Sequence, residues 1–363
     1  MTVALPDRGG CLWWRDGAGL VGRGRAVEIP IGTGGGRAHD AWIALQDSLG
    51  TDSVAFGSFT FDPDVAGSVL FVPEEVERIT ALPALPDRNG VDRPRFAGAR
   101  IDEVHWMEEV ARAVEAVRST DLSKVVLARD EVLWSRAPFS EREVALRLAR
   151  AFPGCYTFLC DGLVGATPEL LVRRRGSEVE SVVLAGTARR GADAEEDAAA
   201  AATMRSSPKE RDEHSLAVGS VVQALRAVCR QIEVEAEPHL LRLPNVQHLA
   251  TRVTAELDDA SVSVLDLLDV LHPTAAVGGV PRGAALDRIR AAEGDLRGRY
   301  AGPVGWIDRN GDGEWGIALR CALLMGDRAR LFAGAGIVEG SLPEEELEET
   351  RLKFRAMEGA LGL

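Results

Sequence analysis

Residues 331–353, LFAGAGIVEGSLPEEELEETRLK, join an apolar run, a glycine-rich turn and a strongly acidic segment. The apolar run predicts a buried strand. The acidic segment predicts a helix that opens near Ser341, with Pro343 in its first turn, where a missing N–H costs nothing. Glu346 and Glu349 are three residues apart, so they project from one face of that helix. The stretch therefore predicts a strand followed by a helix that presents paired carboxylates.

A second pair of glutamates has the same spacing. Glu210 and Glu213 lie in SSPKERDEH, again just after a Ser-Pro helix start. Two such helices can converge on one hard divalent cation, because carboxylate oxygens are the ligands that Mg²⁺ prefers. The alternative interpretation is that acidic residues in first helical turns only complement the helix dipole and face water. Spacing alone leaves both interpretations open.

The composition describes a large acidic chain. Its 363 residues are 46% hydrophobic, enough to bury a large core in one big domain or two ordinary ones, and no polar linker divides them. The 42 basic and 56 acidic residues give a formal net charge of -14, which argues against nucleic acid and anionic membranes as partners. No apolar stretch is long enough to span a bilayer, and the N-terminus lacks the pattern of a signal peptide. Five scattered cysteines without a C-x-x-C pattern favour the reduced cytoplasm.

Lysine is rare, since only Lys124, Lys209 and Lys353 interrupt a basic set that is otherwise arginine. Arginine stays protonated in proteins, whereas the pKa of a lysine can fall enough for it to act as a base. Two of the three lie beside the glutamate pairs, and Lys124 lies in the apolar run LSKVVLARDEVL. Either ammonium chemistry is required at these places, or codon bias leaves three lysines by chance.

Lys124 and Glu169, which follows the proline of GATPELL, are candidate catalytic groups. Burial lowers the pKa of a lysine and raises that of a glutamate, so the two side chains are able to act as base and acid near neutral pH. The sequence equally allows a structural lysine paired with a carboxylate and a glutamate that only caps a turn. Arg320, in the apolar run IALRCALL, is a further candidate and is expected inside a strand.

Alternating apolar segments recur along the rest of the chain. Residues 11–30 predict a hairpin that turns at Asp16 and Gly17, and residues 57–63 and 67–74 predict a second strand pair. Long antiparallel runs with helices between them predict an α+β protein, with large antiparallel sheets in a layered core and helices outside. Helices are expected at 104–118, 141–152, 208–230, 262–271 and 283–292, a strand at 231–237, and either a helix or a mobile loop at 192–204.

Nine segments in order resemble the chorismate-utilising enzymes, and most closely the isochorismate synthases. They are SKVVLAR, GATPELL, LAGTARRG, SPKERDEH, HPTAAVGGVP, YAGPVGW, ALRCALL, FAGAGIVEGS and EEELEETRLK, which together cover about residues 100–360. AFGSFTFDP is similar to the N-terminal part of isochorismate synthases. The resemblance implies a single chorismate-binding catalytic domain over 1–363, with a strand-rich part at 1–98 and the motif-bearing part at 99–363.

The resemblance also implies roles for the candidate residues. Lys124 matches the family's general base, which activates water for attack on the ring carbon beside the carboxylate-bearing carbon of chorismate. Glu169 matches the general acid that protonates the departing hydroxyl. A magnesium ion that grips the ring carboxylate is expected on Glu213 and Glu349, with Glu210 and Glu346 in direct or water-mediated contact.

The substrate pocket is implied in the same way. Arg320 and Lys353, with the metal, would supply the local positive field that the acidic chain lacks overall. The positions that match those holding the enolpyruvyl carboxylate are Tyr300, Arg320, Gly334, Gly336 and Lys353. Gly186, Thr187 and His248 match further positions of the pocket.

The expected nucleophile follows from two positions at which this sequence differs from the ammonia-using members of the same family. Anthranilate synthases have glutamine at the position of Lys124, and aminodeoxychorismate synthases have lysine at the position of Ala185, so both positions favour water over ammonia. Ala276 is typical of isochorismate synthases, whereas many lyase-competent relatives have threonine there. These positions imply a magnesium-dependent isochorismate synthase that releases its product without eliminating pyruvate.

The alternatives are a salicylate synthase, an anthranilate synthase component, and a catalytically silent chorismate-binding or metal-binding protein. The intact Lys124, Glu169 and glutamate pairs argue against a silent protein. The expected partner is chorismate alone, bound by a monomer that needs no amidotransferase.

Overall fold

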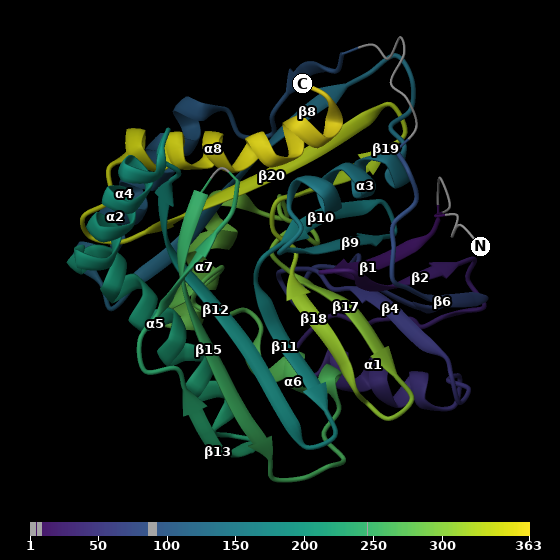
Figure 1. Cartoon of the computed structure of the whole chain (residues 1–363). Coiled ribbons are helices and arrows are strands. Elements are labelled where there is room, and N and C mark those ends of the chain that lie inside the picture. Colours follow the sequence, from purple (N-terminus) through teal and green to yellow (C-terminus); the bar gives the residue numbers. More distant parts are fainter. Residues whose placement is uncertain (1–4, 6–8, 86–92, 245) are drawn as a thin grey trace.

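The structure, a computed structural model, describes residues 5, 9–85, 93–244 and 246–363, apart from the side chain of Lys209. Within these residues the strands form two ten-stranded sheets whose neighbouring strands pair antiparallel. Figure 1 shows the two sheets with helices around them. The layered α+β architecture predicted from the sequence is therefore confirmed.

The first sheet contains the apolar part of residues 331–353 as its strand β20. Its long central pair, β8 and β20, runs in register from Trp134 opposite Arg328 to Val125 opposite Ile337. In order, its strands are β16 (Gly279–Val280), β8 (Lys124–Trp134), β20 (Arg328–Ile337), β19 (Cys321–Met325), β10 (Leu163–Thr167), β9 (Tyr156–Cys160), β1 (Cys11–Arg15), β2 (Ala18–Arg23) and β6 (Glu75–Ile79), with β7 (Arg95–Gly98) beside β8.

The second sheet is built around another long pair, β12 and β15. In order, its strands are β13 (Cys229–Val234), β15 (Val246–Leu257), β12 (Glu178–Arg189), β11 (Leu170–Arg175), β18 (Gly313–Ile317), β17 (Pro303–Asp308), β4 (Val54–Ser58), β5 (Val69–Val72) and β3 (Val27–Glu28), with β14 (His239–Arg242) beside β15.

Strands from the first hundred residues complete both sheets. β1 pairs with β9 in the first sheet, and β4 pairs with β17 in the second. A strand-rich part that closes two sheets cannot bury its apolar faces by itself. We therefore propose that residues 1–363 form one domain.

The helices cover the sheets from outside, and Figure 1 shows the last helix lying along β20. Several begin at a side-chain cap, as where Asp102 Oδ1 accepts from the backbone N–H of His105 at 2.9 Å. The first sheet is contacted by α2 (Glu103–Ser119), α3 (Glu141–Ala151), α7 (Arg282–Glu293) and α8 (Pro343–Leu361). The second sheet is contacted by α4 (Ala194–Ser206), α5 (Pro208–Leu225) and α6 (Val264–Leu271). Helix α1 (Arg37–Gln46) packs on α6.

Some element boundaries differ from those expected. The strand predicted at 57–63 ends at Ser58, because the chain beyond it turns around the buried guanidinium of Arg37. That guanidinium donates to Thr60 Oγ1 at 2.5 Å and to the Thr60 carbonyl at 2.6 Å. Helix α1, which carries Arg37, was not predicted, because it follows a glycine run and starts at Gly36 without a side-chain cap.

Further along the chain, one open alternative is settled and two boundaries move. The segment at 192–204 is helical, as α4. The helix predicted at 208–230 ends at Leu225, and the strand predicted at 231–237 begins at Cys229. At the C-terminus, α8 begins at Pro343 with Leu342 as its N-cap.

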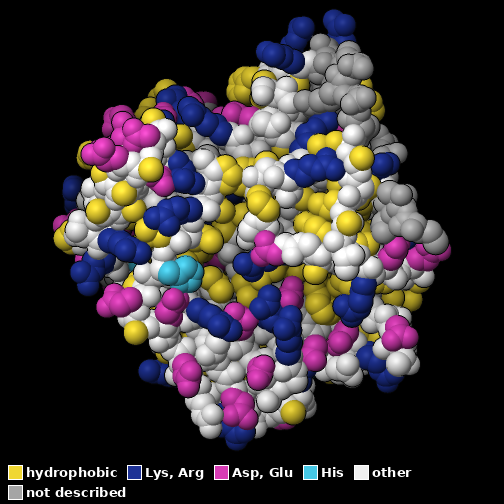
Figure 2. All heavy atoms as spheres, in the orientation of Figure 1, with side chains coloured by type: hydrophobic (Ala, Val, Ile, Leu, Met, Phe, Trp, Pro, Cys, Tyr) yellow, Lys and Arg dark blue, Asp and Glu magenta, His cyan; other side chains and the backbone are white. Residues whose placement is uncertain are grey.

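The face drawn in Figure 2 carries basic and acidic side chains interspersed with hydrophobic ones. Among the described helices, none combines the length and the apolar character needed to cross a membrane. The five cysteines are buried and none is in a disulfide.

A buried ion pair ties α7 to its surroundings. Arg297 donates to the two carboxylate oxygens of Glu293 at 2.8 and 2.9 Å, and both side chains are almost fully buried. Its other N–H groups donate to the carbonyl of Val277 at 2.8 Å and to that of Val126 at 2.6 Å. The pair therefore joins α7, β8 and the loop that carries Val277.

Replacement of Arg297 with Met should lower the free energy of unfolding in urea by about 3–5 kcal/mol, because it leaves a buried carboxylate without its counter-charge. The control is Arg230→Met, which removes the exposed Arg230–Glu256 pair and should leave stability nearly unchanged. Similar losses for the two variants would contradict this account of the pair.

Candidate active site

One cavity lies between β8 and β20 of the first sheet and β12 and β15 of the second, and residues near the N-terminal ends of α5 and α8 complete it. Every candidate residue named from the sequence lines this cavity except Lys124. The lining candidates are Glu169, Gly186, Thr187, Glu210, Glu213, His248, Ala276, Tyr300, Arg320, Gly334, Gly336, Glu346, Glu349 and Lys353.

Lys124 lies just behind the cavity wall, fully buried at the first residue of β8. Its Nζ is 2.9 Å from Oε1 of Glu213, which does line the cavity. Gly336 on the neighbouring strand makes room for this pair, because a Cβ there would stand 2.5 Å from Glu213 Oε1 and 3.2 Å from Lys124 Cε. The structure thus pairs the proposed base with a carboxylate, and that carboxylate is one of the expected metal ligands.

Glu169 lies between β10 and β11 and is 4% exposed. Burial raises the pKa of its carboxyl to about 8, although the positive charges of Lys124 and Arg320 act in the opposite direction. The carboxyl is therefore protonated at neutral pH, so it is able to donate a proton.

Arg320 lies between β18 and β19, where the chain passes from the second sheet to the first, and not inside a strand as predicted. It is buried, and its backbone is left-handed, with φ 46°. Its Nη2 is 2.6 Å from His248 Nε2, whereas its Nε and Nη1 have no hydrogen-bond partner among the described residues. A buried guanidinium with unused donors is suited to bind a carboxylate.

The left-handed backbone at Arg320 predicts an unusual order of stability. We expect the free energy of unfolding in urea to be about 1 kcal/mol higher for Arg320→Gly than for Arg320→Ala, because only glycine adopts this backbone conformation without strain. Both variants lose the guanidinium, so the comparison isolates the backbone. At Arg174, inside β11, the order should reverse. An alanine variant at 320 as stable as the glycine variant would rule out the strain.

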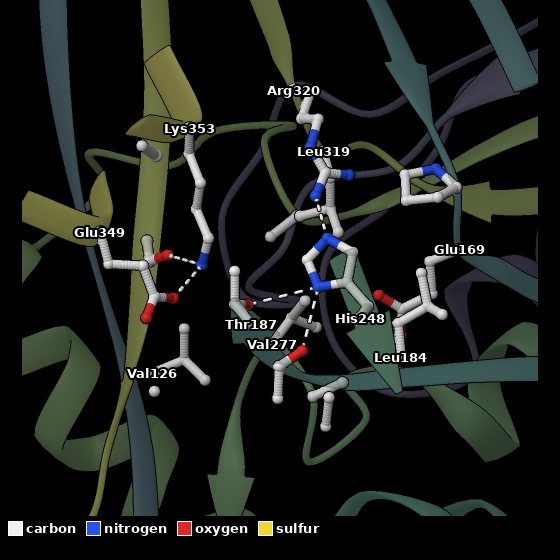
Figure 3. Close-up of a pocket in the computed structure, with 18 of the residues that line it drawn as sticks. Val126, Glu169, Leu184, Thr187, His248, Val277, Leu319, Arg320, Glu349 and Lys353 are labelled. Atoms are coloured by element: carbon white, nitrogen blue, oxygen red, sulfur yellow. Dashed lines mark hydrogen bonds and ion pairs between the residues drawn. The ribbon is translucent and has the colours of Figure 1, made fainter. Parts of the chain in front are cut away.

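Lys353 supplies the second cation of the cavity. Its Nζ donates to Glu349 Oε1 at 2.6 Å and to the carbonyl of Gly334 at 2.7 Å. Figure 3 shows the Lys353–Glu349 pair on one side of the cavity and Glu169 on the other, with Arg320 and His248 between them. The cavity therefore sets a buried proton donor across from a paired cation.

Both glutamate pairs reach this cavity, Glu210 and Glu213 from α5 and Glu346 and Glu349 from α8. Among the described residues, no three carboxylate, imidazole or thiolate groups are gathered closely enough to hold a metal ion. Glu213 and Glu349 each bind an ammonium group, at 2.9 and 2.6 Å, so both carboxylates already stabilise a cation. The donor set of four carboxylates is the kind that a hard divalent cation prefers.

A bulge in β12 at Gly186, where the pairing with β15 shifts register, brings the second sheet close to α5. Gly186 has φ 78°, and a Cβ there would stand 2.9 Å from Glu210 Oε2. The same carboxylate oxygen accepts from the backbone N–H of Thr187 at 3.1 Å. Glycine is therefore needed at this bulge both for its backbone conformation and for the approach of Glu210.

Some lining residues were not singled out from the sequence. Phe332 lies on β20, where its ring stacks on Tyr300 with centroids 5.2 Å apart. Arg297, whose ion pair with Glu293 is described above, also lines the cavity, as does Leu319, which precedes Arg320. Phe332 could have been predicted, because it lies two residues before Gly334 in an expected strand, so the two residues share one face. Nothing in the sequence near Arg297 separates it from the many other arginines.

Comparison with known proteins gives consistent matches along the chain. A family model described as chorismate binding enzyme matches residues 77–362. A Mycobacterium tuberculosis protein is 42% identical over 88% of this chain and 90% of its own length, and DhbC of Bacillus subtilis is 38% identical over 90% and 85%. The crystal structure of DhbC from Bacillus anthracis, 32% identical, superposes with a TM-score of 0.89 over 97% of this chain and 96% of that chain. The chain belongs to the family of chorismate-binding enzymes.

Proposed function

We propose that this protein is an isochorismate synthase, an isomerase that adds water to one ring carbon of chorismate and releases a hydroxyl from another. Its relatives DhbC of Bacillus subtilis and EntC of Escherichia coli, 38% and 35% identical, are named isochorismate synthases. The observation that carries the proposal is the buried carboxyl of Glu169, whose pKa burial raises to about 8, in a cavity that Arg320 and Lys353 also line.

Two side chains move the protons in this proposal. Lys124, in its neutral amine form, accepts a proton from the attacking water, and Glu169 gives a proton to the departing hydroxyl, which leaves as water. One water enters and one leaves, so the product is an isomer of the substrate. A lysine beside the cavity favours water over ammonia, because ammonia needs no base.

The remaining candidates form the pocket around the enolpyruvyl carboxylate of the substrate. Arg320 and Lys353 hold the enolpyruvyl carboxylate, since both are cations at the cavity wall. The other positions shape the pocket around it; they are Gly186, Thr187, Ala276, Tyr300, Gly334 and Gly336.

We assign a magnesium site to the glutamates of α5 and α8. Glu213 and Glu349 would hold the ion, with Glu210 and Glu346 in direct or water-mediated contact. When bound, the ion supplies positive charge that neutralises the ring carboxylate near the leaving group. This assignment is supported by the four carboxylates that line one cavity, because oxygen donors of this kind are what a hard divalent cation prefers.

We further propose that the protein acts as a monomer in the cytoplasm, without an amidotransferase subunit. The use of water removes the need for a partner that delivers ammonia, and the unpaired buried cysteines agree with a reduced compartment.

The test is incubation of the purified protein with chorismate and Mg²⁺, with chromatography of the products and a parallel lactate dehydrogenase assay for pyruvate. We expect isochorismate without pyruvate, no conversion after EDTA treatment, and recovery when Mg²⁺ is restored. Salicylate with stoichiometric pyruvate would make the protein a salicylate synthase, and unchanged chorismate would make it a silent binding protein.

A further inference from the structure

His248 on β15 uses one ring nitrogen to hold Arg320. Its Nε2 is 2.6 Å from Arg320 Nη2, and the side chain is 5% exposed. A guanidinium has five N–H donors and no acceptor, so the imidazole nitrogen in this bond must be the acceptor. Nε2 of His248 therefore carries no proton.

The other ring nitrogen faces the bulge of β12 at Gly186. Nδ1 is 3.1 Å from the carbonyl oxygen of Gly186 and 3.3 Å from Thr187 Oγ1. A carbonyl oxygen only accepts, so Nδ1 must carry the proton. The ring is neutral and in a single tautomer, and both of its nitrogens are engaged within the protein. Burial agrees with this state, since it lowers the pKa of His248 well below the ordinary value.

Arg320 depends on this histidine. The bond to His248 Nε2 is the one hydrogen bond that the described residues provide to the guanidinium. Without it, the flat guanidinium group is free to rotate about its long side chain, and its remaining N–H groups lose their direction. Figure 3 shows the histidine between Arg320 and Thr187, and its dashed lines mark these bonds.

We infer that His248 is a positioning residue, which orients Arg320 by accepting its hydrogen bond and neither touches the substrate nor transfers a proton. This role differs from the direct substrate contact expected from the sequence. It rests on the proposed function only in that Arg320 is assigned to a substrate carboxylate. Because the backbone N–H of Thr187 donates to Glu210, His248 links the carboxylate-binding arginine to the bulge of β12 beside Glu210.

The tautomer is measured directly by ¹⁵N NMR of protein labelled at its six histidines. The His248 signal is identified by its loss in His248→Gln. At pH 7.5 we expect a neutral ring with the proton on Nδ1, and an imidazolium or a proton on Nε2 would overturn the inference. This measurement needs no substrate, so it decides the inference even if the protein does not convert chorismate.

Two amide variants then test the role in catalysis. The amide of His248→Gln can replace Nε2 and accept from Arg320, whereas that of His248→Asn can replace Nδ1 and leaves Arg320 without an acceptor. We expect KM for chorismate within about threefold of wild type for the Gln variant and raised about tenfold or more for the Asn variant, with a smaller change in kcat. Equal effects of the two variants would show a packing role only. A loss of kcat at unchanged KM in both would make His248 a proton-transfer group. Either result would overturn the inference.

Discussion

Glu169→Gln is expected to lower kcat for chorismate conversion by about 10³-fold while leaving the fold intact. The variant keeps the shape of the side chain and removes the proton. With a pKa of about 8, the wild-type carboxyl is about nine-tenths protonated at pH 7. At the ordinary glutamate value it would be protonated in roughly one molecule in 300. Burial therefore raises the amount of competent acid by roughly 300-fold, and the glutamine variant loses all of it.

Two pH profiles check this role for Glu169. Wild-type kcat/KM should fall as pH rises through about 8, where the carboxyl ionises. Stability should also fall between the unfolded pKa near 4.5 and the folded pKa near 8, because over that range only the unfolded chain ionises freely. Glu169→Gln should therefore gain thermal stability relative to wild type as pH rises from 6 to 8. The control is Glu178→Gln, at an exposed position of β12, which should change neither profile. Near-normal turnover of the Glu169 variant would exclude Glu169 as the acid.

Lys124→Ala is expected to abolish turnover, with a loss of at least about 10³-fold in kcat, because the base that activates water is removed. The variant also leaves Glu213 without the ammonium group that binds it at 2.9 Å, so some loss of stability should accompany it. Circular dichroism checks that it folds.

The matched variant is Lys124→Arg, which keeps the positive charge beside Glu213 but cannot give up its proton. If Lys124 acts as a base, the arginine variant is as inactive as the alanine variant. If it only supplies charge, the arginine variant recovers turnover, and the assignment of the base is wrong. Lys353→Ala should differ from both by raising KM more than it lowers kcat, because Lys353 binds and does not transfer protons.

Local patterns in the sequence predicted those parts of the site that depend on spacing along one element. Glu346 and Glu349 share a helical face because they are three residues apart, and the structure places both on the cavity. For Glu169 the sequence left two alternatives open, a catalytic acid and a residue that only caps a turn. Its pKa depends on burial, and residues from distant strands create that burial.

Other parts of the site depend on contacts that no local pattern encodes. Arg320 lies in an apolar run typical of a strand, yet it occupies the crossover between two sheets, and its partner His248 is 72 residues away. The state of that histidine follows from which atoms face it, so the sequence suggested a pocket position but not its role. Helix α1 was missed for a related reason, because Arg37 is fixed by Thr60 and not by local start signals.

The proposed reaction adds water to chorismate, and the most direct test is to run it in H₂¹⁸O with Mg²⁺ and stop it at low conversion. Mass spectrometry of the product should show isochorismate that carries one ¹⁸O in its new hydroxyl group, with no pyruvate formed. Isochorismate without the label would mean that the hydroxyl moves within the substrate, and it would contradict the roles proposed for Lys124 and Glu169.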